Sequence, residues 1–232
     1  MKDIFMKYDI LITDEQESLL KQYYDLLIEW NEKINLTSIT EYEDVVWKHF
    51  LDSALIMKQD VWKQKTEASV LDVGTGAGFP GLVLAILNPA KKFTLLDSLN
   101  KRIEFLNLVV EKLCLNNVST YHGRAETFAR KESFRNQFDF VVSRAVAELP
   151  ILLEYCIPFV KKDGYFVSYK GKRQEEIQSA THAMEELDAS LEFVEKLYLQ
   201  NREERKLLFI KNNCITKDKY PRKEGKPNKK PL

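Results

Sequence analysis

The stretch that decides the fold is Val70-Leu71-Asp72-Val73-Gly74-Thr75-Gly76-Ala77-Gly78-Phe79-Pro80-Gly81. It joins an apolar strand, a loop of alternating glycines and a helix whose first turn suits Pro80. Glycines are needed in such a loop because side chains would hold a ligand away from the backbone amides. A simple tight turn would not need three alternating glycines directly after a strand that carries an acidic residue near its end. The stretch therefore predicts a cofactor-binding loop in an α/β fold.

Outward from this loop, short apolar runs alternate with helical segments. Strands are expected at 69–73, 93–96, 118–121, 138–142 and 165–169, and helices at 80–87, 101–113, 149–159 and 175–187. This alternation is typical of a parallel sheet with helices on both faces. The final strands, 191–199 and 206–212, alternate polar and apolar residues around a charged turn, which predicts an antiparallel hairpin at one sheet edge.

The segment before the loop is expected to be helical over residues 13–58. Thr13 and Gln16 have the spacing of a capping box, and apolar side chains then recur at helical intervals. We therefore divide the chain into a helical cap (1–62), an α/β domain (63–214) and a basic tail (215–232).

Composition excludes several classes of protein. The 232 residues carry 35 basic and 35 acidic side chains, so bulk charge does not indicate a nucleic-acid binder. No 18-residue apolar run predicts a membrane span, and the N-terminus lacks the features of a signal peptide. Three scattered cysteines and three dispersed histidines fit a cytoplasmic protein and predict neither a disulfide framework nor a metal site.

Two cofactors fit the glycine loop. Gly76-x-Gly78-x-x-Gly81 matches the dinucleotide fingerprint, and Asp97, at the end of the next strand, suits ribose hydroxyls with either cofactor. Asp72, two residues before the first glycine, favours S-adenosylmethionine, because an acid suits a cationic sulfonium and pyrophosphate prefers amides and positive charge. The terminal hairpin is also unlike the second half of a dehydrogenase.

Further candidates follow the other strands. Ala125 and Glu126 come after the third strand, where the acid is placed to meet an adenine edge, although an exposed loop carboxylate is an equal alternative. Arg144 follows a buried strand and is expected to point into the crevice at the carboxyl ends of the strands. The alternative is a surface arginine. Lys170 lies at the same edge of the sheet and is a weaker candidate for a site residue.

The two ends of the chain add less specific signals. Asn35 reads locally as a helix C-cap, and His49, alone on a helix, as a structural histidine. In the tail, residues 217–232 hold seven basic residues against two acids, a local net charge of +5. The tail is either a disordered solubilising end or an arm that contacts phosphates. Its candidate contacts are Arg222, Lys223, Lys226, Lys229 and Lys230.

Taken in order, these motifs resemble the RsmG (GidB) family, bacterial methyltransferases that act on guanine N7 in 16S ribosomal RNA. The resemblance covers nearly the whole chain, and the ordered set is specific where the glycine motif alone is not. The matching segments are Asn31-x-x-Ile34-Asn35-Leu36-Thr37, His49-Phe50-Leu51-Asp52-Ser53, Leu71-Asp72-Val73-Gly74-Thr75-Gly76-x-Gly78-x-Pro80-Gly81, Leu95-Leu96-Asp97-Ser98, Ser143-Arg144-Ala145 and Tyr220-Pro221-Arg222.

The resemblance implies a class I S-adenosylmethionine-dependent methyltransferase fold, Rossmann-like, with a seven-stranded, mostly parallel sheet. It implies cofactor contacts from Gly74, Phe79, Asp97, Ala125, Glu126 and Arg144, to which the loop adds Asp72, Gly76 and Gly78. Phe79 is the weakest of these, because a bulky apolar side chain can serve by packing alone. Arg144, and less firmly Asn35, His49 and Lys170, would face the substrate. The implied partner is 16S ribosomal RNA or the small ribosomal subunit. Nothing in the sequence indicates an oligomer, so we expect a monomer, and we expect neither DNA nor a membrane as a partner.

The expected reaction needs no general base, because guanine N7 offers a lone pair and carries no proton. We expect in-line attack on the sulfonium methyl, with catalysis mainly by positioning. Arg144 would either pair with guanine O6 or hold the cofactor carboxylate. Three rivals stay open: a nicotinamide-dependent enzyme, a methyltransferase of the same fold acting on another RNA, a protein or a small molecule, and a non-enzymatic RNA-binding protein. The intact Asp72, glycines and Asp97 argue against the last.

Overall fold

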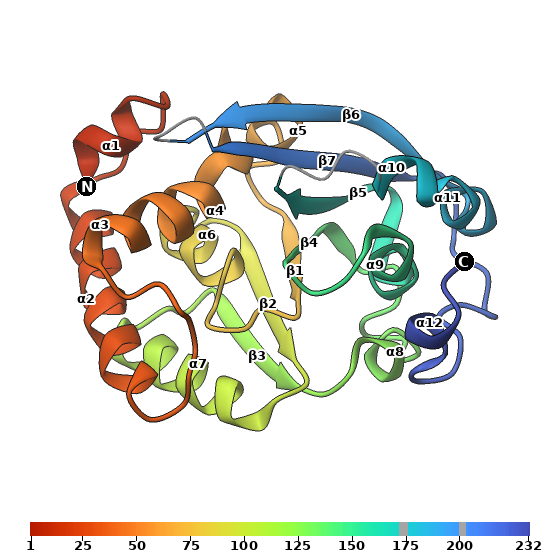
Figure 1. The fold of residues 1–232 in the computed structure, drawn as a ribbon, viewed down its shortest axis with the longest axis horizontal. Helices are drawn as coiled ribbons and strands as arrows, with labels where there is room; N and C mark the ends of the chain where they lie inside the picture. The colour runs from red at the N-terminus through yellow and green to blue at the C-terminus, as the bar shows by residue number, and fades with distance from the viewer. Residues whose placement is uncertain (172–175, 200–202) are drawn as a thin grey trace.

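The computed structural model describes residues 1–171, 176–199 and 203–232. Within them the chain forms a seven-stranded sheet in the order β3-β2-β1-β4-β5-β7-β6 (Figure 1). The parallel strands are β1 (Ser69–Val73), β2 (Lys92–Asp97), β3 (Val118–His122), β4 (Phe138–Arg144) and β5 (Val160–Lys170). The antiparallel strands are β6 (Ala189–Tyr198) and β7 (Glu204–Asn212). The class I fold and the edge hairpin are confirmed.

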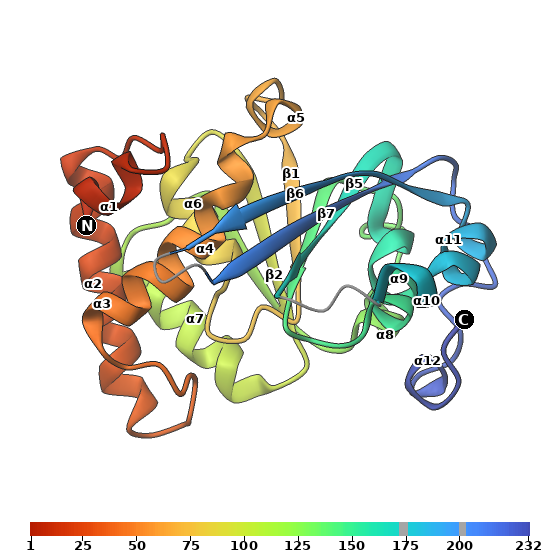
Figure 2. The same cartoon turned by 45° about the horizontal axis from the view of Figure 1, so that its top comes forward.

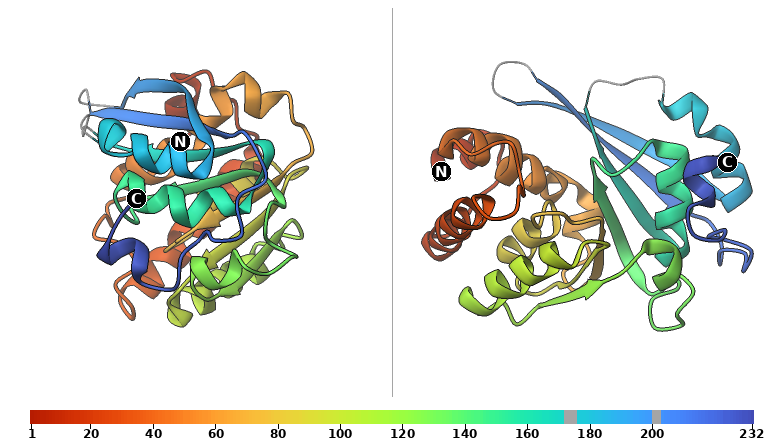
Figure 3. Two further views of the ribbon diagram at one scale, coloured as in Figure 1. Left: turned by 90° about the vertical axis from the view of Figure 1, so that its right-hand side faces the viewer. Right: turned by 60° about the horizontal axis from the view of Figure 1, so that its bottom comes forward.

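Helices cover both faces of the sheet (Figure 3). One face carries α6 (Gly81–Leu87), α7 (Asn100–Lys112) and the N-terminal helices; the other carries α8 (Ala125–Phe128), α9 (Leu149–Cys156), α10 (Glu176–Ser179), α11 (Thr181–Leu187) and α12 (Lys226–Lys229). Each face has its own apolar cluster, because successive side chains of a strand point to opposite faces. Thus Val70 belongs to the cluster on the first face and Leu71 to the cluster on the second.

The N-terminal region is less continuously helical than predicted. It consists of α1 (Lys2–Met6), α2 (Asp14–Asn31), α3 (Tyr42–Val45), the π-helical turn η1 (Val46–Leu51), α4 (Asp52–Ala54), the 3-10 turn η2 (Leu55–Lys58) and α5 (Asp60–Lys63). The capping box at Thr13 and Gln16 is confirmed. The expectation of a helix across 32–41 was wrong, because the Asn31 side chain accepts hydrogen bonds from the amides of Leu36 and Thr37 and reverses the chain.

The cap joins the sheet through a buried aromatic contact. The Tyr23 hydroxyl of α2 donates to the Ala77 carbonyl of the glycine loop, and its ring lies 5.6 Å from that of Phe79. Leu20, Tyr23 and Leu27 of α2 are fully buried. Burying one such side chain contributes about 1.5–3 kcal/mol, so these three hold α2 against α6 and α7.

Element ends differ from the predictions in ways that matter for the site. Strand β4 runs on to Arg144 and β5 to Lys170, so both residues are the last of their strands and not loop residues. The expected helix at 149–159 ends at Cys156 and tightens into a 3-10 turn, η3 (Ile157–Phe159), that contains Pro158. The expected helix at 175–187 is divided into α10 and α11, and Glu175 lies outside the described residues.

The basic tail folds back onto the molecule beside α8 and α9 (Figure 1). The Arg135 guanidinium donates to three tail carbonyls, those of Thr216, Lys217 and Tyr220, at 2.8–3.0 Å. Tyr220 is buried within the second apolar cluster. Of the two alternatives for the tail, that of a disordered end was therefore wrong. In the part of the chain that the structure describes, no helix has the length and apolarity to cross a membrane.

The hairpin also reaches the cap. The end of β6 lies beside the N-terminal helices (Figures 1 and 2), and the Tyr8 hydroxyl donates to the Tyr198 carbonyl at 2.7 Å. The hairpin thus extends across the molecule from the region of α11 to the cap.

Candidate functional site

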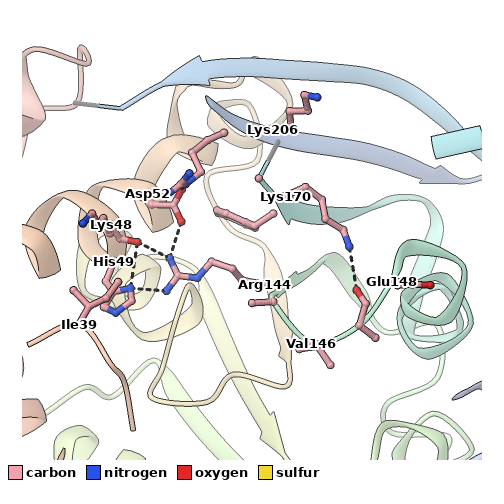
Figure 4. Close-up of a pocket in the computed structure, with 14 residues that line it drawn as sticks. Ile39, Lys48, His49, Asp52, Arg144, Val146, Glu148, Lys170 and Lys206 are labelled. Carbon is pink, nitrogen blue, oxygen red and sulfur yellow. Dashed lines mark hydrogen bonds and ion pairs between the residues drawn. The ribbon is translucent and has the colours of Figure 1, made fainter. Parts of the chain in front are cut away.

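Two adjacent pockets lie at the carboxyl ends of the parallel strands, where ligands bind in open α/β sheets. The smaller, about 180 Å³, is lined from β1, β2, the start of α8 and the tail. The larger, about 630 Å³, is lined from η1, β4, β5 and β7 (Figure 4). Val146 and Ala147 line both, so the segment after β4 divides them.

The smaller pocket brings together four of the predicted cofactor residues: Gly74, Asp97, Ala125 and Glu126. The register explains this, since Val73 pairs with Leu96 and Asp97 with His122, which sets the ends of β1, β2 and β3 side by side. Residues as far apart in sequence as Gly74 and Glu126 therefore converge on one cavity.

The glycines of the loop differ in what a side chain at each position would meet. Gly74 has a φ of +71°, and a Cβ there would lie 2.5 Å from Val146; Gly76, at +62°, faces open space. Gly78 and Gly81 instead permit packing, since a Cβ would lie 2.7 Å from the Tyr23 hydroxyl and 2.4 Å from Leu95, respectively. Of these glycines Gly74 alone lines a pocket, and the cofactor contacts of Gly74, Gly76 and Gly78 stay predictions.

Asp97 braces the loop as well as facing the pocket. Its Oδ2 accepts from the Gly76 amide at 2.9 Å and from Arg102 at 3.3 Å. Among the described residues, Oδ1 accepts from the Leu99 amide alone, at 2.9 Å. A carboxylate oxygen accepts two hydrogen bonds, so Oδ1 retains capacity for a ribose hydroxyl.

Asp72 lies beneath the loop and lines neither pocket. Its Oδ2 accepts from the Gly81 amide at 2.8 Å, whereas Oδ1 is buried with no hydrogen-bond partner among the described residues. Burial raises the pKa of Asp72 to about 7. The carboxyl group therefore ties strand β1 to the start of α6.

Glu126 is buried, 5% exposed, so the alternative of an exposed loop carboxylate was wrong. Its Oε1 accepts from the Gly225 amide at 3.1 Å, and its carboxylate contacts the Tyr155 hydroxyl. Burial, with Glu126 and Glu154 nearby, raises the pKa of Tyr155 to about 12.

Arg144 is fixed in the larger pocket by the cap. Its Nη1 donates to the Lys48 carbonyl at 3.2 Å and to Asp52 at 2.7 Å, and Nη2 lies 3.2 Å from Nδ1 of His49 (Figure 4). The side chain is 14% exposed, so the alternative of a surface arginine was wrong. The Nε hydrogen and one on Nη2 have no partner among the described residues.

His49 is neutral in this arrangement. Burial and the neighbouring Arg144 lower its pKa to about 3. Nδ1 lies 3.2 Å from Nη2 of Arg144, which can only donate, and 3.2 Å from the Lys48 carbonyl, which can only accept, while Nε2 lies 2.9 Å from the Thr37 hydroxyl. Its ring stacks on Phe79 with centroids 4.4 Å apart. The contacts of the ring agree with the structural interpretation of His49. Its side chain also lines the larger pocket, and its expected position facing the substrate stays a prediction.

A family model described as "rRNA small subunit methyltransferase G" (GidB) matches residues 16–208. The chain belongs to this family. Relatives named "Ribosomal RNA small subunit methyltransferase G" include one from Lachnoclostridium phytofermentans, 53% identical over 90% of this chain and 87% of its own. Another, from Desulforamulus reducens, is 47% identical over 98% of this chain and 94% of its own.

Among solved structures, TYW2 of M. jannaschii, crystallised with AdoMet, matches with a TM-score of 0.51 at 15% identity, covering 68% of this chain and 80% of its own. At that identity the likeness shows the fold alone, a mostly parallel sheet with flanking helices.

The remaining predicted residues of this family member are distributed unevenly. Lys170 lines the larger pocket, and its Nζ donates to the Ala147 carbonyl at 3.0 Å. The Phe79 side chain lines neither pocket and packs between His49 and Tyr23, which fits the packing alternative. Asn35 is exposed in the loop after α2 and also lines neither pocket. Its interpretation as a C-cap was wrong, because α2 ends at Asn31.

The candidate residues of the tail differ in their exposure and in their contacts. Arg222 forms an ion pair with the fully buried Glu154, so its guanidinium is engaged within the fold. Lys223, Lys226, Lys229 and Lys230 are exposed.

Sequence reasoning missed several residues that line the larger pocket: Lys48, Asp52, Arg205 and Lys206. Asp52 stands three residues after His49, a spacing that places both on one side of a helix and was a usable signal. Arg205 and Lys206 belong to the distant hairpin, and nothing in the local sequence links them to the site.

Proposed function

We propose that this protein transfers a methyl group from S-adenosylmethionine to N7 of a guanine in 16S ribosomal RNA. One observation carries the proposal beside family membership: a pocket with glycine backbone and an acid at the end of β2 adjoins a larger pocket rich in cations. The first suits a nucleoside cofactor and the second a polyanionic substrate.

The smaller pocket fits the cofactor by its donor set. Gly74 lines the pocket with backbone alone, and Asp97 Oδ1 keeps an acceptor site for a ribose hydroxyl. Bound there, the cofactor supplies an electrophilic methyl group on a sulfonium. At about 180 Å³ the pocket is below the usual size for a whole ligand, so the methionine part is expected to pass Val146 toward the larger pocket.

The larger pocket suits ribonucleic acid. Its lining includes five cationic side chains against two carboxylates. Asp52, one of those carboxylates, pairs with Arg144 and Arg205, and carboxylates outside the lining pair with Lys48 and Lys206. The cations are Lys48, Arg144, Lys170, Arg205 and Lys206. Contacts of this kind supply affinity for phosphates that weakens with salt.

Proton transfer is not required of this site, since guanine N7 attacks through a lone pair. His49 agrees with that view, because burial and the neighbouring Arg144 keep its imidazole neutral. The two unused hydrogens of Arg144 are free either for guanine O6 or for the cofactor carboxylate. Arg144 would then contribute to catalysis by positioning either the guanine or the cofactor.

We further propose that the protein acts as a cytoplasmic monomer on the small subunit or its RNA, with the exposed tail lysines Lys223, Lys226, Lys229 and Lys230 contacting phosphates. Sedimentation of the protein, alone and with the particle, tests the stoichiometry. Binding measured at two salt concentrations tests the phosphate contacts.

The decisive test is transfer of labelled methyl from S-adenosylmethionine to small subunits from a strain lacking this gene, with the modified nucleoside identified by mass spectrometry. One 7-methylguanosine per particle is expected. Asp97→Ala is the matched loss-of-cofactor control and should give little transfer. Cofactor binding without transfer to particle, naked RNA or assembly intermediates would overturn the assigned substrate while leaving the cofactor in place.

A further inference from the structure

The C-terminal residues 220–230, here called the strap, are anchored to the fold by a buried carboxylate. Glu154 of α9 is fully buried and accepts from the backbone amide of Arg222 at 2.7 Å and from its Nε at 2.8 Å. The same guanidinium donates to the Lys230 carbonyl at 2.8 Å, which closes the strap on itself. A charged, doubly hydrogen-bonded contact of this kind fixes geometry as well as position.

This anchoring carries the strap to the smaller pocket. Glu224 pairs with Arg124 at 2.5 Å, and the Gly225 amide donates to Glu126 Oε1 at 3.1 Å. Gly225 adopts a φ of +73°, a conformation that favours glycine, and so turns the chain toward that carboxylate. Three residues later, Asn228 lines the same pocket as Gly74, Asp97 and Glu126.

We propose that the strap forms the outer wall of the nucleoside end of the cofactor pocket and that the Asn228 amide contacts the bound adenosine. The inference rests on the proposed cofactor. An amide side chain both donates and accepts hydrogen bonds, which suits an adenine edge or a ribose hydroxyl. Because Gly225 holds Glu126 and the next turn presents Asn228, the strap organises two polar groups on one side of the pocket.

The geometry favours this role over that of an RNA arm alone. The guanidinium of Arg222, which could otherwise contact RNA phosphates, already donates hydrogen bonds to Glu154 and to the Lys230 carbonyl. The four lysines stay exposed around Asn228, so the strap can meet the cofactor with its amide and the substrate with its charges.

Calorimetric titration with S-adenosylhomocysteine, without any RNA, tests the proposal. Four proteins are compared: the full chain, Asn228→Ala, a chain that ends at Glu224, and Asn213→Ala. The last is an exposed asparagine that lies before the strap and lines neither pocket. We expect Asn228→Ala to bind roughly fivefold more weakly, equivalent to about 1 kcal/mol, and the shortened chain to bind at least tenfold more weakly. Asn213→Ala should bind as the full chain does.

The outcomes are distinguishable. If the full chain itself fails to bind S-adenosylhomocysteine, the proposed cofactor is wrong and the inference falls with it. If the full chain binds and Asn228→Ala binds equally well, the inference alone is overturned. Should the shortened chain fail to fold, Asn228→Ala still decides the question. Unchanged cofactor affinity together with weaker RNA binding would assign the strap to the substrate.

Discussion

At Arg144, one side chain is held by three groups of the cap: the Lys48 carbonyl, Asp52 and His49. The strand end that carries it was predictable, because ligands gather at the carboxyl ends of parallel strands. The groups that orient it were not, since they come from residues more than 90 positions away. Sequence patterns locate such a residue on a strand but do not show which hydrogen bonds fix its direction.

Arg144→Lys is expected to reduce kcat/KM for methyl transfer by at least about tenfold. A lysine has three donors on one atom and cannot reach the carbonyl, the carboxylate and the imidazole while also presenting a planar edge. Kinetics with the particle and calorimetry with S-adenosylhomocysteine separate the two roles. Weaker cofactor binding would indicate the carboxylate role, and unchanged cofactor binding with slower transfer would indicate guanine O6. Wild-type values for both would exclude both roles.

His49 predicts a pH dependence of stability. Its folded pKa of about 3 lies below the ordinary value of 6.5, so the unfolded chain binds a proton that the folded chain does not bind until about pH 3. The stabilisation from this group is complete above pH 6.5 and declines as the pH falls toward 3. Urea unfolding at several pH values should show a smaller loss between pH 7 and 4 for His49→Gln than for wild type.

The matched control is His122→Gln, which replaces an exposed imidazole at the end of β3. An identical pH profile for wild type and His49→Gln, whatever the control shows, would contradict the buried, neutral His49.

At the scale of elements, the loop between β1 and α6 and the edge hairpin followed from local patterns: alternating glycines after a strand, and alternating polarity around a turn. The breaks were harder to predict. The reversal after α2 depends on the Asn31 side chain, and the early end of α9 on a 3-10 turn at Pro158. Each break is caused by one residue, through the hydrogen bonds of the Asn31 side chain or through the ring of Pro158. The apolar residues around both breaks still recur at helical spacing, so the hydrophobic pattern does not reveal them.

The glycine loop gives a comparison within one element. Gly78→Ala should lower the free energy of unfolding by about 2–3 kcal/mol, because its Cβ would lie 2.7 Å from the Tyr23 hydroxyl at a φ of +104°. Gly76→Ala, with φ of +62° and open space around the Cβ, should cost only about 1 kcal/mol. Urea unfolding measures both. An equal or larger loss for Gly76→Ala would show that strain, and not the contact with the cap, governs this loop.

At the scale of the whole molecule, one carboxylate connects three distant parts of the chain. Asp52 of the cap pairs with Arg144 of β4 at 2.7 Å and with Arg205 of β7 at 3.2 Å. Nearby, the Tyr169 hydroxyl of β5 donates to the Ser53 carbonyl at 2.8 Å. Cap, sheet and hairpin thus meet beside the larger pocket, so the site depends on their mutual arrangement. No local window of sequence contains that information, which is why Arg205 escaped prediction.

Asp52→Asn tests this connection. The substitution keeps the shape but leaves two arginines facing each other without the buried carboxylate, which is 6% exposed. Removing one partner of a buried pair costs about 3–5 kcal/mol, and partial solvation of the arginines reduces the expected loss here to about 2–3 kcal/mol. Urea unfolding measures the loss, with Asp60→Asn as the control, because Asp60 pairs with Lys63 on the surface and such pairs contribute less than about 1 kcal/mol. Adding Arg205→Gln to Asp52→Asn should restore part of the stability by removing one of the facing charges. If the double variant is no more stable than Asp52→Asn, the carboxylate acts on Arg144 alone and the hairpin is held to the cap by its other contacts.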